Sequence, residues 1–243
     1  MDDCYHQQHV PVGTAALLAL VARLLASRQV CSSQPIDAVG RIWNKVKMAD
    51  RYRNFAKLAE KQRLGVDYAI RIEDRGTPLV ILAPHGGWIE RGTSEIGEAI
   101  AGADMSFYAF EALKKGAHGD FHITSHRFDE PTAIELVGKS HIAVAIHGRG
   151  NGKNDAIWIG GRAIALGNVI GASLRDVGFA AGPNKRLPGR HPSNICNRTL
   201  LGEGVQLELS RSLRQKLVGE AGLLSTFCEA VRNAMLSLKP DGF

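Results

Sequence analysis

Two histidines stand at the ends of two apolar runs, and each is followed by glycine. The run Leu79–Ala83 leads through Pro84 to His85-Gly86-Gly87, and the run Ile142–Ile146 leads to His147-Gly148. Continuous apolar runs of this length are typical of strands buried on both faces of a sheet. Because ligands bind beyond the carboxyl ends of such strands, we expect the two imidazoles to converge on one point. Neutral imidazole is a good ligand for zinc.

A carboxylate completes this set of candidate ligands. Glu90 follows His85 by five residues, a spacing that suits a loop curling back, and the two glycines between them allow the curl. His85, Glu90 and His147 then form the two-histidine, one-glutamate set of a catalytic zinc, which leaves a fourth position for water. Glu95 competes with Glu90, but we interpret it as a carboxylate in the first turn of a helix. The alternative is that each histidine is a hydrogen-bonded structural residue.

Three further side chains are candidates for catalysis or substrate binding. Glu208 lies on the polar side of the alternating strand Val205–Ser210. A carboxylate there needs a partner or has a raised pKa, and it can take a proton from water and hand it to a leaving amine. Arg198 can bind a substrate carboxylate, although a salt bridge from Glu208 to Arg198 or Arg211 is the alternative. His122 is a site candidate because strand alternation would place it on the same side as Thr124.

The remaining patterns predict an α/β fold: a single domain with a central mixed, mostly parallel sheet flanked by helices. Residues 1–45 are expected to form an N-terminal extension, and residues 46–243 the zinc hydrolase domain. Further strands are expected at residues 66–73, 105–110, 121–124 and 156–159. Helices are expected at residues 47–64, 93–102, 131–137, 162–177 and 215–238.

Composition excludes several classes of protein. Of the 243 residues, 44% are apolar and 22% charged, which is ordinary for a globular protein and excludes collagen, coiled coil and wholesale disorder. The sequence contains no run of about 18 or more apolar residues, so it predicts no membrane span. The four cysteines form no CxxC pair, and no HExxH, P-loop or GxSxG motif occurs. A net charge of +6 weakly favours an anionic partner.

The N-terminal segment contains an apolar run within residues 10–26. Asp2 and Asp3 precede it without any Lys or Arg, whereas a signal peptide begins with positive charge. We therefore expect a cytoplasmic protein, with export as the alternative if residues 10–26 act as a signal segment.

Five ordered segments resemble the poly-γ-glutamate hydrolase family of bacteriophages and bacteria, over a region from about residue 48 to residue 214. They are Ala83–Glu95, His122–Ser125 with Phe128–Pro131, Ile146–Gly148, Asn194–Arg198 and Gly204–Ser210. The resemblance implies a zinc-carboxypeptidase-like fold and cleavage of the γ-amide bonds of an anionic capsule polymer. It also implies that His85, Glu90 and His147 are the zinc ligands and that Glu208 is the general base. For His122 and Arg198 it leaves substrate contacts and oxyanion contacts both open.

We therefore expect a zinc-dependent hydrolase of γ-glutamyl amide bonds that acts on an anionic polymer or peptide. One alternative is a zinc amidase or carboxypeptidase acting on the γ-glutamyl peptides of peptidoglycan. Another is a basic nucleic-acid-binding protein that uses the segments around Arg51 and Lys185. The absence of a helix-turn-helix, zinc-finger or RNP pattern disfavours nucleic acid as the partner. The sequence carries no signal for an oligomeric state.

Overall fold

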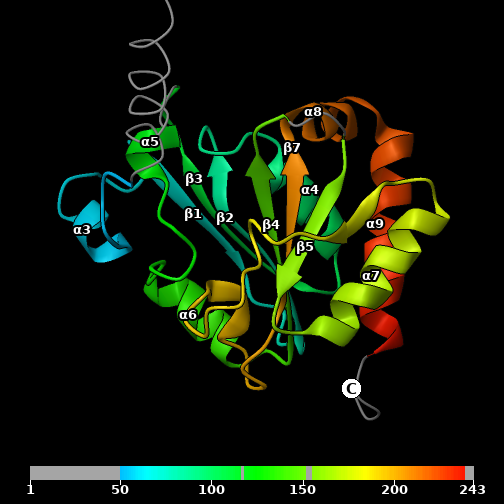
Figure 1. Ribbon diagram of the computed structural model, residues 1–243. Coiled ribbons are helices and arrows are strands. Elements are labelled where there is room, and N and C mark those ends of the chain that lie inside the picture. Colours follow the sequence, from blue (N-terminus) through cyan, green and yellow to red (C-terminus); the bar gives the residue numbers. More distant parts are fainter. Residues whose placement is uncertain (1–49, 116–117, 152–154, 239–243) are drawn as a thin grey trace, which may run out of the picture. The chain divides into compact units, whose positions relative to one another are not determined.

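The computed structural model describes residues 50–115, 118–151 and 155–238 (Figure 1). The expected N-terminal extension and the apolar run within residues 10–26 lie outside these residues. None of the described helices is long and apolar enough to cross a membrane.

Seven strands form one sheet in the order β1-β3-β2-β4-β7-β5-β6. Strands β3, β2, β4 and β7 are parallel, β1 is antiparallel to β3, β5 is antiparallel to β7, and β6 is parallel to β5. The predicted α/β fold with a mixed, mostly parallel sheet is therefore confirmed. The strands are β1 Tyr68–Glu73, β2 Leu79–Gly87, β3 Ser106–Ala112, β4 Ile142–Arg149, β5 Ile157–Gly161, β6 Ala181–Pro183 and β7 Val205–Ser210.

Helices cover both faces of the sheet and enclose two apolar cores. The first core contains side chains of α4 (Thr93–Ala101), α7 (Ile164–Asp176), α8 (Arg211–Gly219) and α9 (Ala221–Ser237). The second contains side chains of α3 (Phe55–Ala59), α6 (Pro131–Gly138) and the short 3-10 helix η1 (Ile195–Asn197). The alternation predicted for β7 is confirmed, because its apolar residues all belong to the first core and its polar residues face the other side.

The expected strand at residues 121–124 is wrong. The helix α5 (His118–Phe121) ends there, and the chain continues without regular structure. The carboxylate of Asp50 accepts hydrogen bonds from both the backbone N–H and the hydroxyl of Thr124, at 2.8 and 2.7 Å. A side chain therefore takes the backbone donor that a strand ladder would have used.

Two expected helices differ in extent. Within residues 50–64 only α3 is helical, and it ends where the N–H groups of Lys61 and Gln62 both bond to Leu58 O. The expected helix at residues 215–238 is two helices. Ser210 caps α8 by accepting from Leu213 N, and Glu220, with extended backbone at φ −129° and ψ 95°, separates α8 from α9.

The carboxyl ends of β2, β4 and β7 meet at one edge of the sheet, at the top of Figure 1. Alternation alone would direct His85 toward the first core, because Ala83 packs there. The pairing of β2 with β3 shifts register between Ala83 and Gly86, and this bulge turns His85 to the opposite face. Its ring lies edge-on to Phe128 of the second core, with centroids 6.4 Å apart.

At Gly204 the backbone packs directly against the backbone of Cys196 and Ala143. A Cβ at this position would lie 1.9 Å from Cys196 O and 3.0 Å from Ala143 O. Gly204→Ala is therefore expected to lower the free energy of unfolding by about 1–3 kcal/mol. Gly222→Ala, at an exposed position of α9 with no heavy atom within 4 Å, is the control and is expected to be neutral or slightly stabilising. Urea denaturation measures both variants, and equal effects would contradict the steric argument.

Candidate metal centre

His85, Glu90 and His147 meet at the carboxyl edge of β2 and β4. The Nδ1 atoms of the two histidines are 3.1 Å apart. Glu90 Oε2 lies 3.4 Å from Nδ1 of His85 and 3.9 Å from Nδ1 of His147. All three side chains are buried, with residue exposures of 1%, 6% and 3%. The structure thus brings together the three residues that the sequence singled out as ligands.

The outer atoms of these side chains are held by neighbouring groups. His85 Nε2 is 2.8 Å from the carbonyl oxygen of Ile123, and His147 Nε2 is 3.4 Å from Ser125 Oγ. A carbonyl only accepts, so neutral His85 carries its proton on Nε2 and its lone pair on Nδ1. The backbone N–H of Gly148 donates to Glu90 Oε2 at 2.6 Å. These contacts fix the orientation of each candidate ligand.

The separations fit a metal ion. At 3.1 Å the two Nδ1 atoms are close enough to share one proton or to bind one cation. Ligands placed about 2.0–2.1 Å from a tetrahedral zinc ion lie roughly 3.3–3.4 Å from one another. The observed separations of 3.1, 3.4 and 3.9 Å bracket that value, so the donor set and its spacing both suit zinc.

Burial sets the charge of this cluster. It lowers the pKa of His147 to about 3, with the charge of His85 adding to the effect, so the His147 imidazole is neutral. Burial also acts to raise the pKa of Glu90. Its neighbours His85 and His147 outweigh that effect and hold the pKa of Glu90 well below its usual range. A neutral imidazole beside an ionised carboxylate is the state in which both groups bind metals.

His122 lies beside the same cluster. Its Nε2 is 3.9 Å from Glu90 Oε1, and its ring centroid is 4.2 Å from that of His85. His85, Glu90 and His122 each offer an atom within 4.8 Å of the others, so His122 is also within reach of an ion bound there. Its side chain is 26% exposed, so His122 is the solvent-facing member of the group.

Asp50 orients His122. Nδ1 of His122 and Oδ1 of Asp50 are 2.7 Å apart, and Oδ2 of Asp50 accepts the two hydrogen bonds from Thr124. Burial opposes ionisation of Asp50, but these hydrogen bonds prevail and keep its pKa below the usual range. The sequence prediction missed Asp50, because the contact spans 72 residues and no local motif marks it. It also placed His122 on a strand, whereas His122 follows α5 in irregular backbone.

Glu208 stands next to His147 across the sheet, since the two residues are register partners of β7 and β4. Its Oε1 accepts a hydrogen bond from Gln206 Nε2 at 3.0 Å. Burial raises the pKa of Glu208 to about 8, assisted by the charge of Glu90 and opposed by Arg149 and Arg214. Among the described residues Glu208 forms no salt bridge, so the alternative pairing considered from the sequence is wrong.

Arg198 contacts none of the cluster residues in the described part of the chain. Its Nε donates to Ser193 O at 3.0 Å, and its predicted contact with substrate stays a prediction. A different arginine, Arg214 of α8, is buried beside the site. It donates to Arg91 O at 2.8 Å and to Leu209 O. The sequence prediction missed it because the helical pattern predicted for that segment began only at residue 215.

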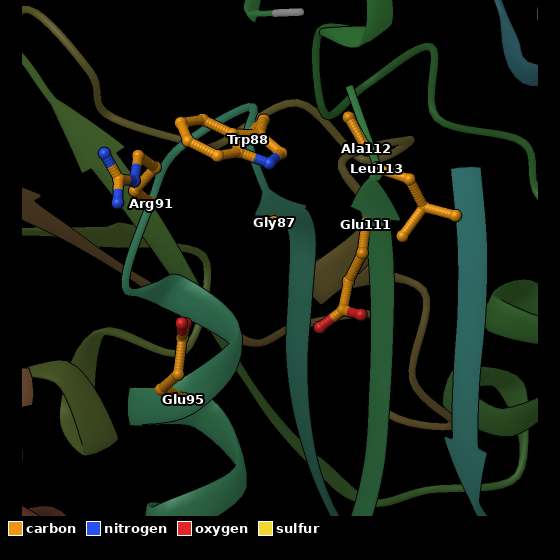
Figure 2. A pocket seen from close by; sticks show the side chains of 7 residues that line it. All are labelled: Gly87, Trp88, Arg91, Glu95, Glu111, Ala112 and Leu113. Carbon is orange, nitrogen blue, oxygen red and sulfur yellow. The ribbon is translucent and has the colours of Figure 1, made fainter. Parts of the chain in front are cut away.

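The loop after β2 has a second side, which lines a cavity of about 350 Å³ between the ends of β2 and β3 and the start of α4 (Figure 2). The guanidinium of Arg91 stacks on the Trp88 ring at 4.4 Å, and Glu95 and Glu111 lie below that ring. Glu95 thus belongs to the first turn of α4, as predicted, and lines this cavity while Glu90 faces the histidines.

The raised pKa of Glu208 predicts a pH-dependent stability in the metal-free protein. Its contribution is fully present below the ordinary pKa of 4.5 and is lost as pH rises toward about 8, because folding then disfavours the ionised form. Glu208→Gln is expected to remove this loss, so that its stability relative to wild type rises between pH 5 and pH 8. The difference should reach a few kcal/mol at most, about 1.4 kcal/mol per pKa unit.

Urea denaturation in EDTA at several pH values measures this effect. Glu135→Gln, which changes an exposed glutamate of α6, serves as the control and should follow wild type. Parallel curves for wild type and Glu208→Gln would show that Glu208 titrates normally.

Comparison with known proteins identifies close relatives. A family model described as poly-gamma-glutamate hydrolase matches residues 52–229. The SPbeta prophage-derived protein YoqZ of Bacillus subtilis is 36% identical over 193 residues, which cover 78% of this chain and 67% of that protein. YndL of the same organism is 33% identical over 179 residues, covering 72% of this chain and 70% of YndL.

Two solved structures share the fold. One is a bacteriophage poly-gamma-glutamate hydrolase, with a TM-score of 0.74 and 30% identity over 78% of this chain and 98% of that one. The other is the zinc-free form of YndL, with a TM-score of 0.73 and 29% identity over 79% of this chain and all of that one (100%). Sequence and structure comparisons thus agree on one group of relatives.

Proposed function

This chain belongs to the poly-gamma-glutamate hydrolase family, and from that premise we propose that it is a zinc-dependent hydrolase that cleaves the γ-glutamyl amide bonds of poly-γ-glutamate. One observation carries the assignment of the centre: the facing Nδ1 atoms of His85 and His147, 3.1 Å apart, with Glu90 Oε2 beside both. The zinc-free form of the relative YndL supports zinc as the metal.

His85, Glu90 and His147 would hold the zinc ion. When bound there, zinc supplies Lewis-acid chemistry: it polarises the scissile carbonyl and makes a nearby water molecule more acidic. The chain contributes the fixed orientation of these ligands. Ile123 O and Ser125 Oγ hold the two imidazoles through their Nε2 atoms, and Gly148 N–H holds the carboxylate.

Glu208 is the proposed general base. Glu208 is the register partner of His147 on the neighbouring strand, and its carboxylate accepts a proton from the attacking water and returns it to the leaving nitrogen. Burial gives it an affinity for protons that an exposed glutamate lacks, and a positive charge at the neighbouring centre would lower that affinity. The two carboxylates of the site therefore have separate tasks, with Glu90 kept ionised and Glu208 able to carry a proton.

His122 is the proposed substrate-side imidazole, and Asp50 is its positioning residue. Because the Asp50 carboxylate accepts the proton of Nδ1, the Nε2 lone pair of neutral His122 is directed toward the cluster. From this position Nε2 can accept a hydrogen bond from the attacking water or from a substrate N–H. The exposure of His122 leaves that approach open.

The experiment that tests the proposal is the size distribution of poly-γ-glutamate after incubation with purified, zinc-loaded protein. Wild type is expected to shorten the polymer. His85→Ala and His147→Ala are expected to lose both zinc and activity. Glu208→Gln is expected to retain zinc and lose turnover by about 10²–10⁴-fold, as expected for removal of a general base.

His122→Ala is the matched control among the histidines. It should keep its zinc, measured by metal analysis, because we assign His122 outside the ligand set. If His122→Ala lost its zinc and His147→Ala retained it, His122 and not His147 would be the third zinc ligand. If zinc-loaded wild type left the polymer intact, the substrate would be another amide, such as the γ-glutamyl peptides of peptidoglycan.

Asp50→Asn tests the positioning role. The N–H of Thr124 requires an acceptor, so the amide oxygen would face Thr124 and the amide NH₂ would face His122. This forces the proton of His122 onto Nε2 and should lower kcat roughly 10–100-fold with zinc content unchanged. The ¹⁵N shifts of the imidazole report the tautomer. Asp120→Asn, at an exposed carboxylate paired with Arg51, should change neither quantity, and an unchanged tautomer in Asp50→Asn would refute the role.

A further inference from the structure

A stretch of the chain near the site carries positive charge without compensation. Residues 177–202 contain no Asp or Glu, although they include four basic side chains. Within this stretch we define the basic loop as residues 184–191. Lys185, Arg186 and Arg190 are exposed there, and none of them forms an ion pair with any residue that the structure describes.

Several other basic side chains of the described residues are paired with carboxylates. Arg51 pairs with Asp120 at 2.9 Å and Lys57 with Glu60 at 2.6 Å. Lys139 and Lys216 likewise have aspartate partners. In the segment around Arg51, which the sequence offered as one half of an anion-binding surface, Arg51, Lys57 and Arg63 are thus paired with carboxylates, whereas Arg53 and Lys61 form no ion pair with a described residue. The basic loop keeps its charge available for a ligand.

Hydrogen bonds fix the basic loop against the sheet, and in Figure 1 the chain between α7 and β7 crosses in front of β5. Pro188 O accepts from Gly161 N at 2.9 Å, and Gly189 O accepts from Asn197 Nδ2 at 2.8 Å. Gly189 has φ +59°, and a Cβ there would lie 2.4 Å from Gln206 Oε1. Glycine is therefore required where the loop meets β7.

The attachment points of the loop are also neighbours of the proposed catalytic groups. Gln206 Nε2 donates to Leu187 O at 3.4 Å and to Glu208 Oε1 at 3.0 Å, so one side chain connects the loop to the general base. At the other end of the loop, the ring of His191 lies 4.9 Å from that of His126. His126 directly follows Ser125, whose hydroxyl contacts His147.

We propose that the basic loop is a substrate-binding surface that holds free carboxylates of an anionic polymer whose scissile bond lies at the candidate metal centre. This inference rests on the proposed function and adds where the polymer is held. Each γ-linked glutamate keeps one free carboxylate, so the polymer presents a negative charge in every repeat beyond the cleaved bond. Guanidinium groups bind carboxylates in bidentate geometry, and an ammonium group adds point charge.

The test is a variant that replaces Lys185, Arg186 and Arg190 with glutamine. Its control replaces Lys57, Lys61 and Lys139, three exposed lysines on or beside α3 and α6, and removes the same charge. Binding of long poly-γ-glutamate is measured by calorimetry in the zinc-loaded Glu208→Gln background. The loop variant is expected to bind about tenfold more weakly or worse, with a shallower dependence on salt, and the control should bind like the parent.

Kinetics separate this inference from the proposed function. In the active background the loop variant should raise KM for long polymer while leaving kcat and zinc content unchanged. A γ-linked dipeptide is too short to span the loop and the centre, so its cleavage should not change. Equal affinity for polymer in the loop variant and the control would overturn the inference, even if cleavage at the centre is intact. Loss of cleavage in all proteins, with the difference in polymer binding retained, would overturn only the proposed function.

Double-stranded DNA is measured in the same way as a competing polyanion. Tighter binding of DNA than of poly-γ-glutamate, lost in the loop variant, would overturn the assignment to a polycarboxylate and would assign the loop to nucleic acid. Weaker binding of DNA supports the assignment.

Discussion

Two imidazoles and one carboxylate are gathered in a buried place, with the atoms that can bind a proton or a metal ion facing one another. Nδ1 of His85, Nδ1 of His147 and Oε2 of Glu90 approach within 3.1 to 3.9 Å. Such an arrangement is costly unless a cation or a shared proton lies among the atoms. The surrounding structure is arranged to hold it: the bulge in β2 aims one histidine, β4 carries the other, and a backbone N–H fixes the carboxylate.

The electrostatics of the site separate two carboxylates that lie on the same side of one sheet. Glu90 sits among imidazoles and stays ionised, whereas Glu208 sits in a buried position where the charge of Glu90 adds to the cost of ionisation. Arg149 and Arg214 limit that cost without pairing directly with Glu208. The guanidinium of Arg214 donates to backbone carbonyl oxygens, which hold its positive charge in a fixed position near Glu208. The same functional group is therefore suited to metal binding at Glu90 and to proton transfer at Glu208.

The sequence predicted those features that follow from periodicity and from the ends of strands. The apolar runs before His85 and His147 indicated buried parallel strands, and their shared edge brought the histidines together. Alternation placed Glu208 on the polar side of β7. Prediction failed where a distant side chain decides the local structure. Thr124 could not be recognised as irregular without Asp50, and the helix break at Glu220 lies in a segment with continuous helical periodicity.

The glycines at the strand ends have a consequence for how this protein can change. A Cβ at Gly148 would lie 2.4 Å from the guanidinium carbon of Arg214, and one at Gly86 would lie 2.0 Å from Ser94 Oγ. These positions are closed by packing, so they serve close contact more than flexibility. Replacing either glycine therefore requires Arg214 or Ser94 to move, whereas the exposed side chains of Lys185, Arg186 and Arg190 can change without such a displacement. A change of substrate preference is therefore easier to make at these three side chains than in the packed strand ends that hold the candidate ligands.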